Sequence, residues 1–418
     1  MRIALIATSL RRAGAEKQFS YATRALHQAG IDARVFYLGA GDHYQTVLAN
    51  EGIPFRQIFN PDQSFLMLLR LIKELVAFRP HVVLASQFGD LLFAGVAGRV
   101  CGALVLGGVR SDGFYELRTS GRRSWLMLKL SHGLIANSER AKDNLISLGI
   151  AAQKIAVVPN VIDPTDFDQK MSRPFQNSAW EHRISVTAVG SLQYCKRFDR
   201  FLDGLALARQ REPSLFGVIA GDDLGEKAAL ERKANALGLF PDHLQFLGDC
   251  AQIPSLLAGS RMLVSCSEYE GFPNVILEAM AARLPVLITP VGDARRIVKD
   301  GVTGYLLQPD DPHCMAERIV SLAREPAQAH QMGEAGRKLV EQDYNITSLA
   351  PRLLSVFSDL AVKHRKAIAA GSQPKRELKQ ARAKMAPGPP PFPRLGGTFA
   401  PPIRTESRRL AQGSLQQG

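Results

Sequence analysis

The stretch RIALIATSLRRAGAEKQFSYATRALHQAG, residues 2–30, joins a short apolar run to a helical pattern and decides the fold class. Residues 2–7 have the composition of a buried strand, and residues 14–30 carry apolar side chains at helical spacing. Gly30 is a typical helix end. A strand that leads directly into a helix predicts one unit of a parallel sheet.

The same unit recurs along the chain, in two sets. Expected strands are, in the first half, residues 33–38, 81–86, 103–108 and 133–138, and, in the second half, residues 184–190, 215–221, 244–248, 261–267 and 285–290. Residues 198–210 and 226–239 have helical patterns between strands of the second set. The sequence therefore predicts an α/β protein with two Rossmann-like domains that face each other across a cleft lined by strand carboxyl ends.

The joint between the two sets falls at residues 159–180, a stretch with Pro, Asp and Ser but no periodicity. We expect an N-terminal domain over residues 1–165 and a second domain over residues 166–344. Residues 345–366 are expected to form a helix that returns to the first domain. Residues 367–418 are basic and rich in Pro, which predicts a disordered tail.

The formal net charge of +13 is concentrated at the C-terminal end. From Lys366 onward there are ten Lys and Arg residues against Glu377 and Glu406, which is +8. Most of the basic excess therefore lies in the tail, which has no recognised nucleic-acid-binding pattern. No nucleic-acid partner is expected.

Five cysteines are scattered without a CxxC or Cys/His pattern, which favours reduced cytosolic thiols and predicts no metal site. The first apolar run is too short for a signal sequence. No charge-free run approaches the roughly 18 residues of a membrane-spanning helix. These features predict a cytoplasmic protein.

The stretch EYEGFPNVILEAM, residues 268–280, places two carboxylates eight positions apart. Pro273 and Asn274 favour a helix start, so Glu270 lies on a loop and Glu278 lies inside the helix. Backbone amides beside Gly271 become accessible to a ligand at such a helix start. A carboxylate accepts two hydroxyl donors at once, in bonds stronger than neutral ones.

Several segments in this order resemble the nucleotide-sugar-dependent glycosyltransferases of family 4, which have the GT-B fold. They are LRRAGAEKQ (10–18), KIAVVPNVIDPTDF (154–167), AVGSLQYCKRFD (188–199), VIAGDDLGEKAALERKANALGL (218–239), LQFLGD (244–249) and residues 268–307. The resemblance covers roughly residues 1 to 365.

The resemblance implies roles for the two glutamates. Glu270 would contact hydroxyls of the donor sugar, and Glu278 would accept hydrogen bonds from the nucleotide ribose. Amides around four residues would address phosphate or sugar oxygens: Gly271, Phe272, Asn274 and Val275.

The resemblance implies further contacts, and at two of these positions the sequence departs from the family pattern. Lys196 and Arg197 follow a strand end, where fixed cations can stabilise charge developing on a diphosphate leaving group. Ser191 stands where relatives often have a basic residue; either Arg197 compensates at the diphosphate or the serine serves as a neutral donor. Arg110 stands where many have a histidine and is a candidate acceptor or donor contact. Gly14 resembles the glycine loop that faces the diphosphate. Leu247, in FLG, resembles the strand end that holds the nucleobase.

The implied activity is transfer of a sugar, with retention of configuration, from a nucleotide-diphosphate sugar to a hydroxyl of a glycan or lipid-linked acceptor, in cell-surface polysaccharide or glycolipid biosynthesis. No cofactor or metal is expected. Two alternatives stay open. One is a nucleotide-sugar epimerase of the same fold, against which the lack of a His/acid set in the first domain counts. The other is a non-catalytic binding protein with a basic tail.

Two stretches, residues 63–79 and 121–132, combine basic residues with dense apolar ones. They have two interpretations: peripheral contact with an anionic membrane at its inner face, or helices that pack into the core of the first domain.

Overall fold

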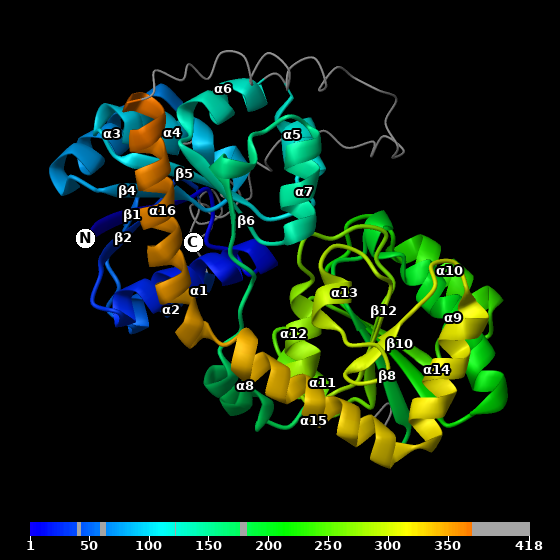
Figure 1. Ribbon diagram of the computed structural model, residues 1–418. Helices are drawn as coiled ribbons and strands as arrows, with labels where there is room; N and C mark the ends of the chain where they lie inside the picture. The colour runs from blue at the N-terminus through cyan, green and yellow to red at the C-terminus, as the bar shows by residue number, and fades with distance from the viewer. Residues whose placement is uncertain (40–42, 59–63, 122, 176–181, 370–418) are drawn as a thin grey trace, which may run out of the picture.

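The computed structural model of the chain describes residues 1–39, 43–58, 64–121, 123–175 and 182–369. These residues form two α/β domains, each built on one parallel sheet (Figure 1). The predicted fold class is confirmed. Residues 176–180 of the expected joint, and the expected tail from residue 370 onward, lie outside the described residues.

The first domain contains a seven-stranded sheet in the order β3-β2-β1-β4-β5-β6-β7. Its strands are β1 (Arg2–Ala7), β2 (Asp32–Tyr37), β3 (Phe55–Gln57), β4 (Val82–Ala85), β5 (Leu104–Val109), β6 (Gly133–Ala136) and β7 (Ile155–Val157). Its helices are α1 (Gly14–Gln28), α2 (His43–Asn50), α3 (Ser64–Phe78), α4 (Leu91–Val100), α5 (Phe114–Ser120), α6 (Arg123–Leu130) and α7 (Glu139–Ser147). The strands are apolar because helices cover both faces of the sheet.

The second domain contains a six-stranded sheet in the order β10-β9-β8-β11-β12-β13. Its strands are β8 (Ile184–Val189), β9 (Leu215–Ala220), β10 (Leu244–Gly248), β11 (Met262–Ser265), β12 (Val286–Ile288) and β13 (Gly304–Leu306). The helices around it are α8 (Pro164–Met171), α9 (Phe198–Arg211), α10 (Lys227–Ala236), α11 (Ile253–Ala258), α12 (Asn274–Ala281), α13 (Ala294–Ile297), α14 (Pro312–Arg324) and α15 (Pro326–Asp343).

Local sequence explains where several helices begin. Asp163 precedes Pro164 at the start of α8, and its side chain accepts the Asp166 N–H. Asp311 precedes Pro312 at the start of α14 in the same way. An acidic cap followed by proline at the first helical position satisfies a free N–H and fixes the backbone for the helix.

The two domains meet through loops that follow strand carboxyl ends. Asp293, after β12, accepts hydrogen bonds from the backbone N–H groups of Glu139 and Arg140 at 3.0 and 3.1 Å. These N–H groups belong to the first turn of α7, which follows β6. The carboxyl edges of the two sheets therefore face one another. Rossmann-like domains bind their ligands at this edge.

The last described helix, α16 (Leu349–Ala369), follows α15 and runs along the first domain (Figure 1). Its Leu353, Phe357 and Leu360 are buried in the same apolar cluster as residues of β1 and α1. The C-terminal part of the described chain thus helps to complete the core of the first domain. Among the described residues, no helix has both the length and the apolar character needed to cross a bilayer.

Candidate active site

Lys196 and Glu270 are brought together from two adjacent strands of the second sheet. Lys196 ends a short turn after β8, and Glu270 lies on the loop after β11, the neighbour of β8. The Lys196 Nζ is 2.5 Å from Glu270 Oε1, and the Ser267 hydroxyl donates to the same oxygen at 2.9 Å. The carboxylate and the ammonium thus hold each other in place at the carboxyl edge of the sheet.

Burial alone would lower the pKa of Lys196, but the charge of Glu270 and the hydrogen bond to it act more strongly in the other direction. The pKa of Lys196 is therefore raised above its ordinary value. The side chain stays charged at neutral pH, although only 22% of it is exposed. A fixed cation in a partly dry site is suited to an anionic ligand.

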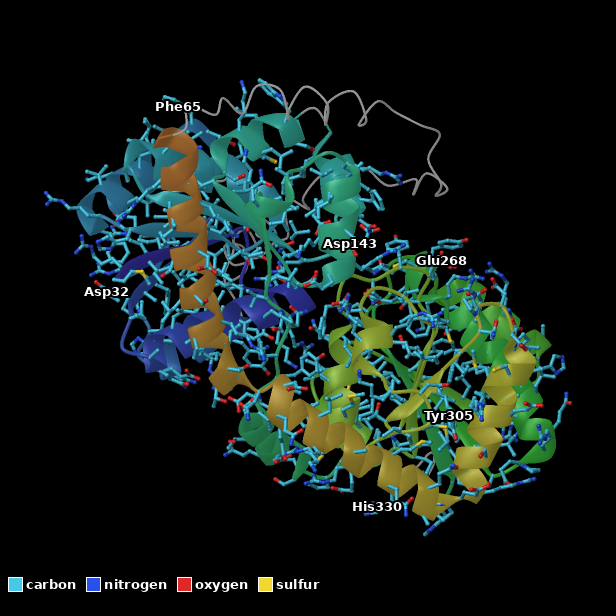
Figure 2. All side chains as sticks on the ribbon, in the orientation of Figure 1. Asp32, Phe65, Asp143, Glu268, Tyr305 and His330 are labelled. Carbon is cyan, nitrogen blue, oxygen red and sulfur yellow. The ribbon has the colours of Figure 1, made fainter. Side chains whose placement is uncertain are left out.

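Arg197 has a different environment from its neighbour. Its backbone is left-handed, with φ 49°, and its guanidinium donates twice to Asp199 at 2.9 Å and once to Glu268 at 2.9 Å. Glu268, labelled in Figure 2, lies on the side of the second domain turned toward the first. The structure does not bring this guanidinium to Glu270, so a shared role with Lys196 stays a prediction.

The Glu270 loop fits tightly against the first domain because Gly271 has no side chain. A Cβ atom at Gly271 would lie 2.2 Å from the Ser111 carbonyl oxygen. The Phe272 side chain is buried, with its ring centroid 5.8 Å from that of Tyr344. Only the backbone of Phe272 is therefore free to serve a ligand.

The helix α12 begins at Asn274, with Pro273 before it. Asn274 and Val275 occupy its first turn, where backbone N–H groups have no partner within the helix. The Asn274 side chain joins the domains, because Oδ1 accepts from Asn160 at 2.8 Å and Nδ2 donates to the Gly14 carbonyl at 3.3 Å. A Cβ atom at Gly14 would approach Asn274 Nδ2 to 2.8 Å.

Glu278 lies one turn further along α12 and pairs with Lys17 of α1, at 2.6 Å between Nζ and Oε1. Burial opposes the charge of Lys17, but Glu278 overcomes that effect and the pKa of Lys17 is raised. The expected ribose acceptor thus contacts a cation from the opposite domain. Lys17 was not among the predicted site residues, although it lies three positions after Gly14.

Ser191 and Leu247 lie after β8 and within β10, respectively. The Ser191 hydroxyl accepts from the Gln193 side chain at 3.0 Å. Leu247 is half-buried and packs against a small apolar cluster that runs along β9. Their expected contacts with a diphosphate and a nucleobase stay predictions.

Arg110 follows β5 on the first domain. Its Nε donates to the Ser86 carbonyl at 3.2 Å, and its backbone N–H donates to Glu116 at 2.8 Å. Burial lowers the pKa of Arg110 to about 10, while the nearby charge of Glu116 acts in the opposite direction. The side chain stays cationic at neutral pH.

A polar group at the carboxyl ends of β1 and β4 was missed by the sequence analysis. Buried Asp90 accepts from the Thr8 hydroxyl and from the Gln87 backbone N–H, and burial raises its pKa to about 6. Glu16, also buried, accepts from Ser9 at 2.8 Å. The residues come from distant positions, so only the fold brings them together.

The described residues contain no group of three or more His, Cys, Asp or Glu side chains placed to hold a metal ion. The arrangement instead offers two partly buried ammonium groups, Lys196 and Lys17, two carboxylates and the start of α12. Such a set can bind a diphosphate together with several hydroxyl groups.

Comparisons with known proteins match each of the two domains to a glycosyltransferase family. Residues 12–166 match the family described as Glycosyltransferase Family 4, and residues 171–339 match Glycosyl transferases group 1. The chain is 32% identical to the putative glycosyltransferase EpsD of Bacillus subtilis over 143 residues, which are 34% of this chain and 37% of that protein. It is 30% identical to N-acetyl-alpha-D-glucosaminyl L-malate synthase of Bacillus anthracis over 119 residues, 28% of this chain and 31% of that protein.

The matched regions thus span about a third of the length of these two relatives. The structure resembles that of Anabaena HepE in complex with UDP and glucose, with a TM-score of 0.74 and 20% identity. That similarity covers 86% of this chain and 99% of the other and concerns the fold. The matches to both domains and the shared fold show that the chain belongs to the family 4 glycosyltransferases of the GT-B fold.

Proposed function

We propose that this protein transfers a sugar from a nucleotide-diphosphate sugar to a hydroxyl group, with the anomeric configuration retained. The observation that carries the proposal is the pair of Lys196 and Glu270, 2.5 Å apart at the carboxyl edge of the second sheet. It offers a cation for phosphate oxygens beside an acceptor for sugar hydroxyls. Glu278 and the start of α12 extend the same surface toward a nucleotide.

In the proposed reaction the bond between the anomeric carbon and the diphosphate oxygen breaks, and a bond to the acceptor oxygen forms on the same face. Negative charge develops on the departing diphosphate. Lys196 is held in place before the reaction, so it stabilises that charge without reorganisation. The acceptor hydroxyl loses its proton, which the departing diphosphate can take up.

The two glutamates have separate tasks in this proposal. Glu270 holds the sugar hydroxyls and so sets the position of the anomeric carbon. Glu278 accepts hydrogen bonds from the ribose, and Lys17 keeps its carboxylate oriented. The amides of Gly271, Asn274 and Val275 address the remaining phosphate or sugar oxygens.

The acceptor is proposed to bind at the first domain, close to Arg110. A glycan or lipid-linked acceptor in cell-surface polysaccharide or glycolipid biosynthesis fits a cytoplasmic protein at the inner membrane face. The outer surface of α3 supports peripheral contact with the membrane, because it combines exposed apolar and basic side chains. The apolar side chains are Phe65, Leu69 and Val76, exposed by 69%, 45% and 51%, and the basic ones are Arg70 and Lys73. Figure 2 shows Phe65 on the first domain, away from the second domain.

A panel of nucleotide sugars tests the proposed function. Thermal shift identifies the donors that bind, and hydrolysis of each bound donor is then measured. We expect one or a few donors to stabilise the wild type and to be hydrolysed slowly, with both effects reduced in Lys196→Ala. Lys170→Ala, at an exposed ion pair on α8, is the matched control. No stabilisation by any nucleotide sugar would contradict the proposal.

A further inference from the structure

A cavity of about 1110 Å³ lies on the first domain, at the opposite edge of the sheet from the candidate active site. Its wall includes Arg2, Val82 and Leu104, the first residues of β1, β4 and β5. The candidate active site lies beyond the carboxyl ends of the parallel strands, whereas this cavity lies at their amino ends. α16, which crosses the first domain in Figure 1, closes one side through Phe357 and His364.

Among the residues that the structure describes, four arginines and no aspartate or glutamate line the cavity; the arginines are Arg2, Arg79, Arg99 and Arg365. None of them has an ion pair with a carboxylate among the described residues. Elsewhere in the same chain arginines do find acidic partners, as Arg24 does with Glu51 and Arg337 with Asp168. The Arg2 guanidinium donates to the Arg79 carbonyl at 2.8 Å, and that of Arg99 donates to the Leu130 and Lys129 carbonyls at 2.9 and 3.1 Å. These carbonyls hold the two side chains in place without a carboxylate. Four guanidinium groups without a carboxylate partner around one hollow favour an anionic ligand.

Two histidines of the wall add hydrogen-bond donors. His81 Nδ1 accepts the Arg2 backbone N–H at 2.9 Å, and His132 Nδ1 accepts the Val105 backbone N–H at 2.8 Å. Since Nδ1 is the acceptor, the proton of each neutral ring is on Nε2. Both rings therefore offer an N–H donor in a cavity that already contains arginine donors.

The surroundings of His132 are positively charged. Its ring centroid is 4.0 Å from that of His364, and both rings line the cavity. Burial lowers the pKa of His132 to about 3, and the charges of Arg99 and His364 act in the same direction. A bound anion would reverse the electrostatic part of that effect.

Apolar residues complete the wall. Val76 and Val100 are 51% and 59% exposed at the cavity, and Phe357 contributes an apolar ring from α16. A ligand with a phosphate group and a less polar body would satisfy both parts of the wall.

We propose that this cavity is a binding site for a phosphorylated ligand, separate from the candidate donor site. Phosphate accepts several hydrogen bonds at once from guanidinium groups and imidazole N–H groups. Because α16 lines the cavity and continues from α15 of the second domain, the bound ligand would fasten α16 to the first sheet. The site goes beyond the transfer reaction and does not depend on it.

The test uses the full chain, labelled with ¹⁵N at histidine, and inorganic pyrophosphate as the probe. We expect the ring signals of His132 and His364 to shift in a saturable manner. These signals report on the cavity even if pyrophosphate also binds near Lys196. The Arg79→Gln/Arg365→Gln double variant should bind at least roughly ten-fold more weakly, because two charge-assisted contacts are removed.

Neither the Arg79 nor the Arg365 guanidinium makes a hydrogen bond within the described part of the chain, so the variant should fold. Both single variants are made as well, and each should bind more weakly than the wild type. Arg232→Gln, at an exposed arginine of α10, is the matched control and should bind as the wild type does. Ring shifts that are equal in wild type and double variant would overturn the proposal.

A second arm identifies the source of the phosphate group. Sedimentation with phosphatidylglycerol vesicles is compared with phosphatidylcholine vesicles, for the wild type and the double variant. Binding to the anionic vesicles that is lost in the double variant would support the site and assign a lipid headgroup to it. Ring shifts with pyrophosphate but no vesicle binding would assign a soluble ligand. No effect in either arm would overturn the proposal.

Discussion

The charged side chains on the two faces of the candidate active site are neutralised in different ways. On the second domain, Glu270 and Glu278 each pair with a lysine, at 2.5 and 2.6 Å. On the first domain, buried Asp90 accepts hydrogen bonds from the Thr8 hydroxyl and from backbone N–H groups and has no ion pair with a cation among the described residues, and burial raises its pKa to about 6. Paired charges stay fixed at neutral pH, whereas a carboxylate without a cation responds to pH. The two carboxylates on the second domain are therefore held as ions at neutral pH, whereas Asp90 on the first domain changes its charge near pH 6.

Lys196→Ala should have the largest effect, because it removes the proposed cation and leaves the Glu270 carboxylate without its partner. We expect turnover of the donor to fall roughly 10²- to 10³-fold, as for loss of one preorganised group at a developing charge. Steady-state kinetics measures it. Near wild-type turnover in a folded Lys196→Ala protein would remove Lys196 from the chemistry.

Asp90→Asn tests the first-domain face of the site through the pH dependence of the free energy of unfolding. The folded pKa of about 6 lies above the ordinary value of 3.8, so the folded chain holds the proton more tightly between these pH values. This contribution to stability is present below about pH 4 and is lost as the pH rises through 6, by roughly 3 kcal/mol in total. The variant lacks this loss, so its stability relative to wild type should increase from pH 4.5 to pH 7.

Urea denaturation at the two pH values measures the effect, with exposed Asp143→Asn of α7 as the control. A constant difference between Asp90→Asn and wild type across this pH range would show that Asp90 is already ionised at pH 4.5.

Asp293→Ala should act more weakly, by removing the contact that links the loop after β12 to α7. Two hydrogen bonds to a helix start are lost, which costs about 1 kcal/mol of domain closure. We expect the KM for the donor to rise several-fold. Asp311→Ala is a matched control, since Asp311 caps α14 within the second domain. Equal KM changes in both variants would argue against a role for the interdomain contact.

Removal of the chain after Ala369 should have the smallest effect. The basic, Pro-rich composition of that segment predicts no contribution to a packed domain. Donor hydrolysis and thermal stability should match those of the full chain. Loss of turnover in a truncated protein that remains folded would place part of the site in the removed segment.

The fold could be predicted because most strands of both sheets are buried apolar runs. β9, for example, is buried along its whole length and reads as a continuous apolar segment. The sequence analysis missed β3, β7 and β13, which have three residues each and lie at sheet edges. Such short edge strands have too few residues to show a period. Their pairing depends on the neighbouring strand.

The candidate site was predictable where its residues cluster in sequence. Glu270, Gly271, Asn274 and Glu278 lie within one turn and one helix, so their spacing indicated their placement. Lys17 and Asp293 were missed because each acts on the opposite domain. Lys17 follows the predicted glycine loop by three residues, which is a usable signal. Nothing near Asp293 in the sequence indicates that it contacts α7.

A comparison of the effects of Glu270→Ala and Glu278→Ala tests the proposed function most directly. Affinity for the free nucleotide diphosphate is measured by calorimetry, beside turnover of the nucleotide sugar, in folded Glu270→Ala and Glu278→Ala proteins. Glu278→Ala should weaken nucleotide binding by about 1.5 to 3 kcal/mol, the usual value for a hydrogen bond to a charged group. Glu270→Ala should leave nucleotide affinity nearly unchanged and lower turnover. Wild-type affinity and turnover in both variants would contradict the proposed roles of the two glutamates.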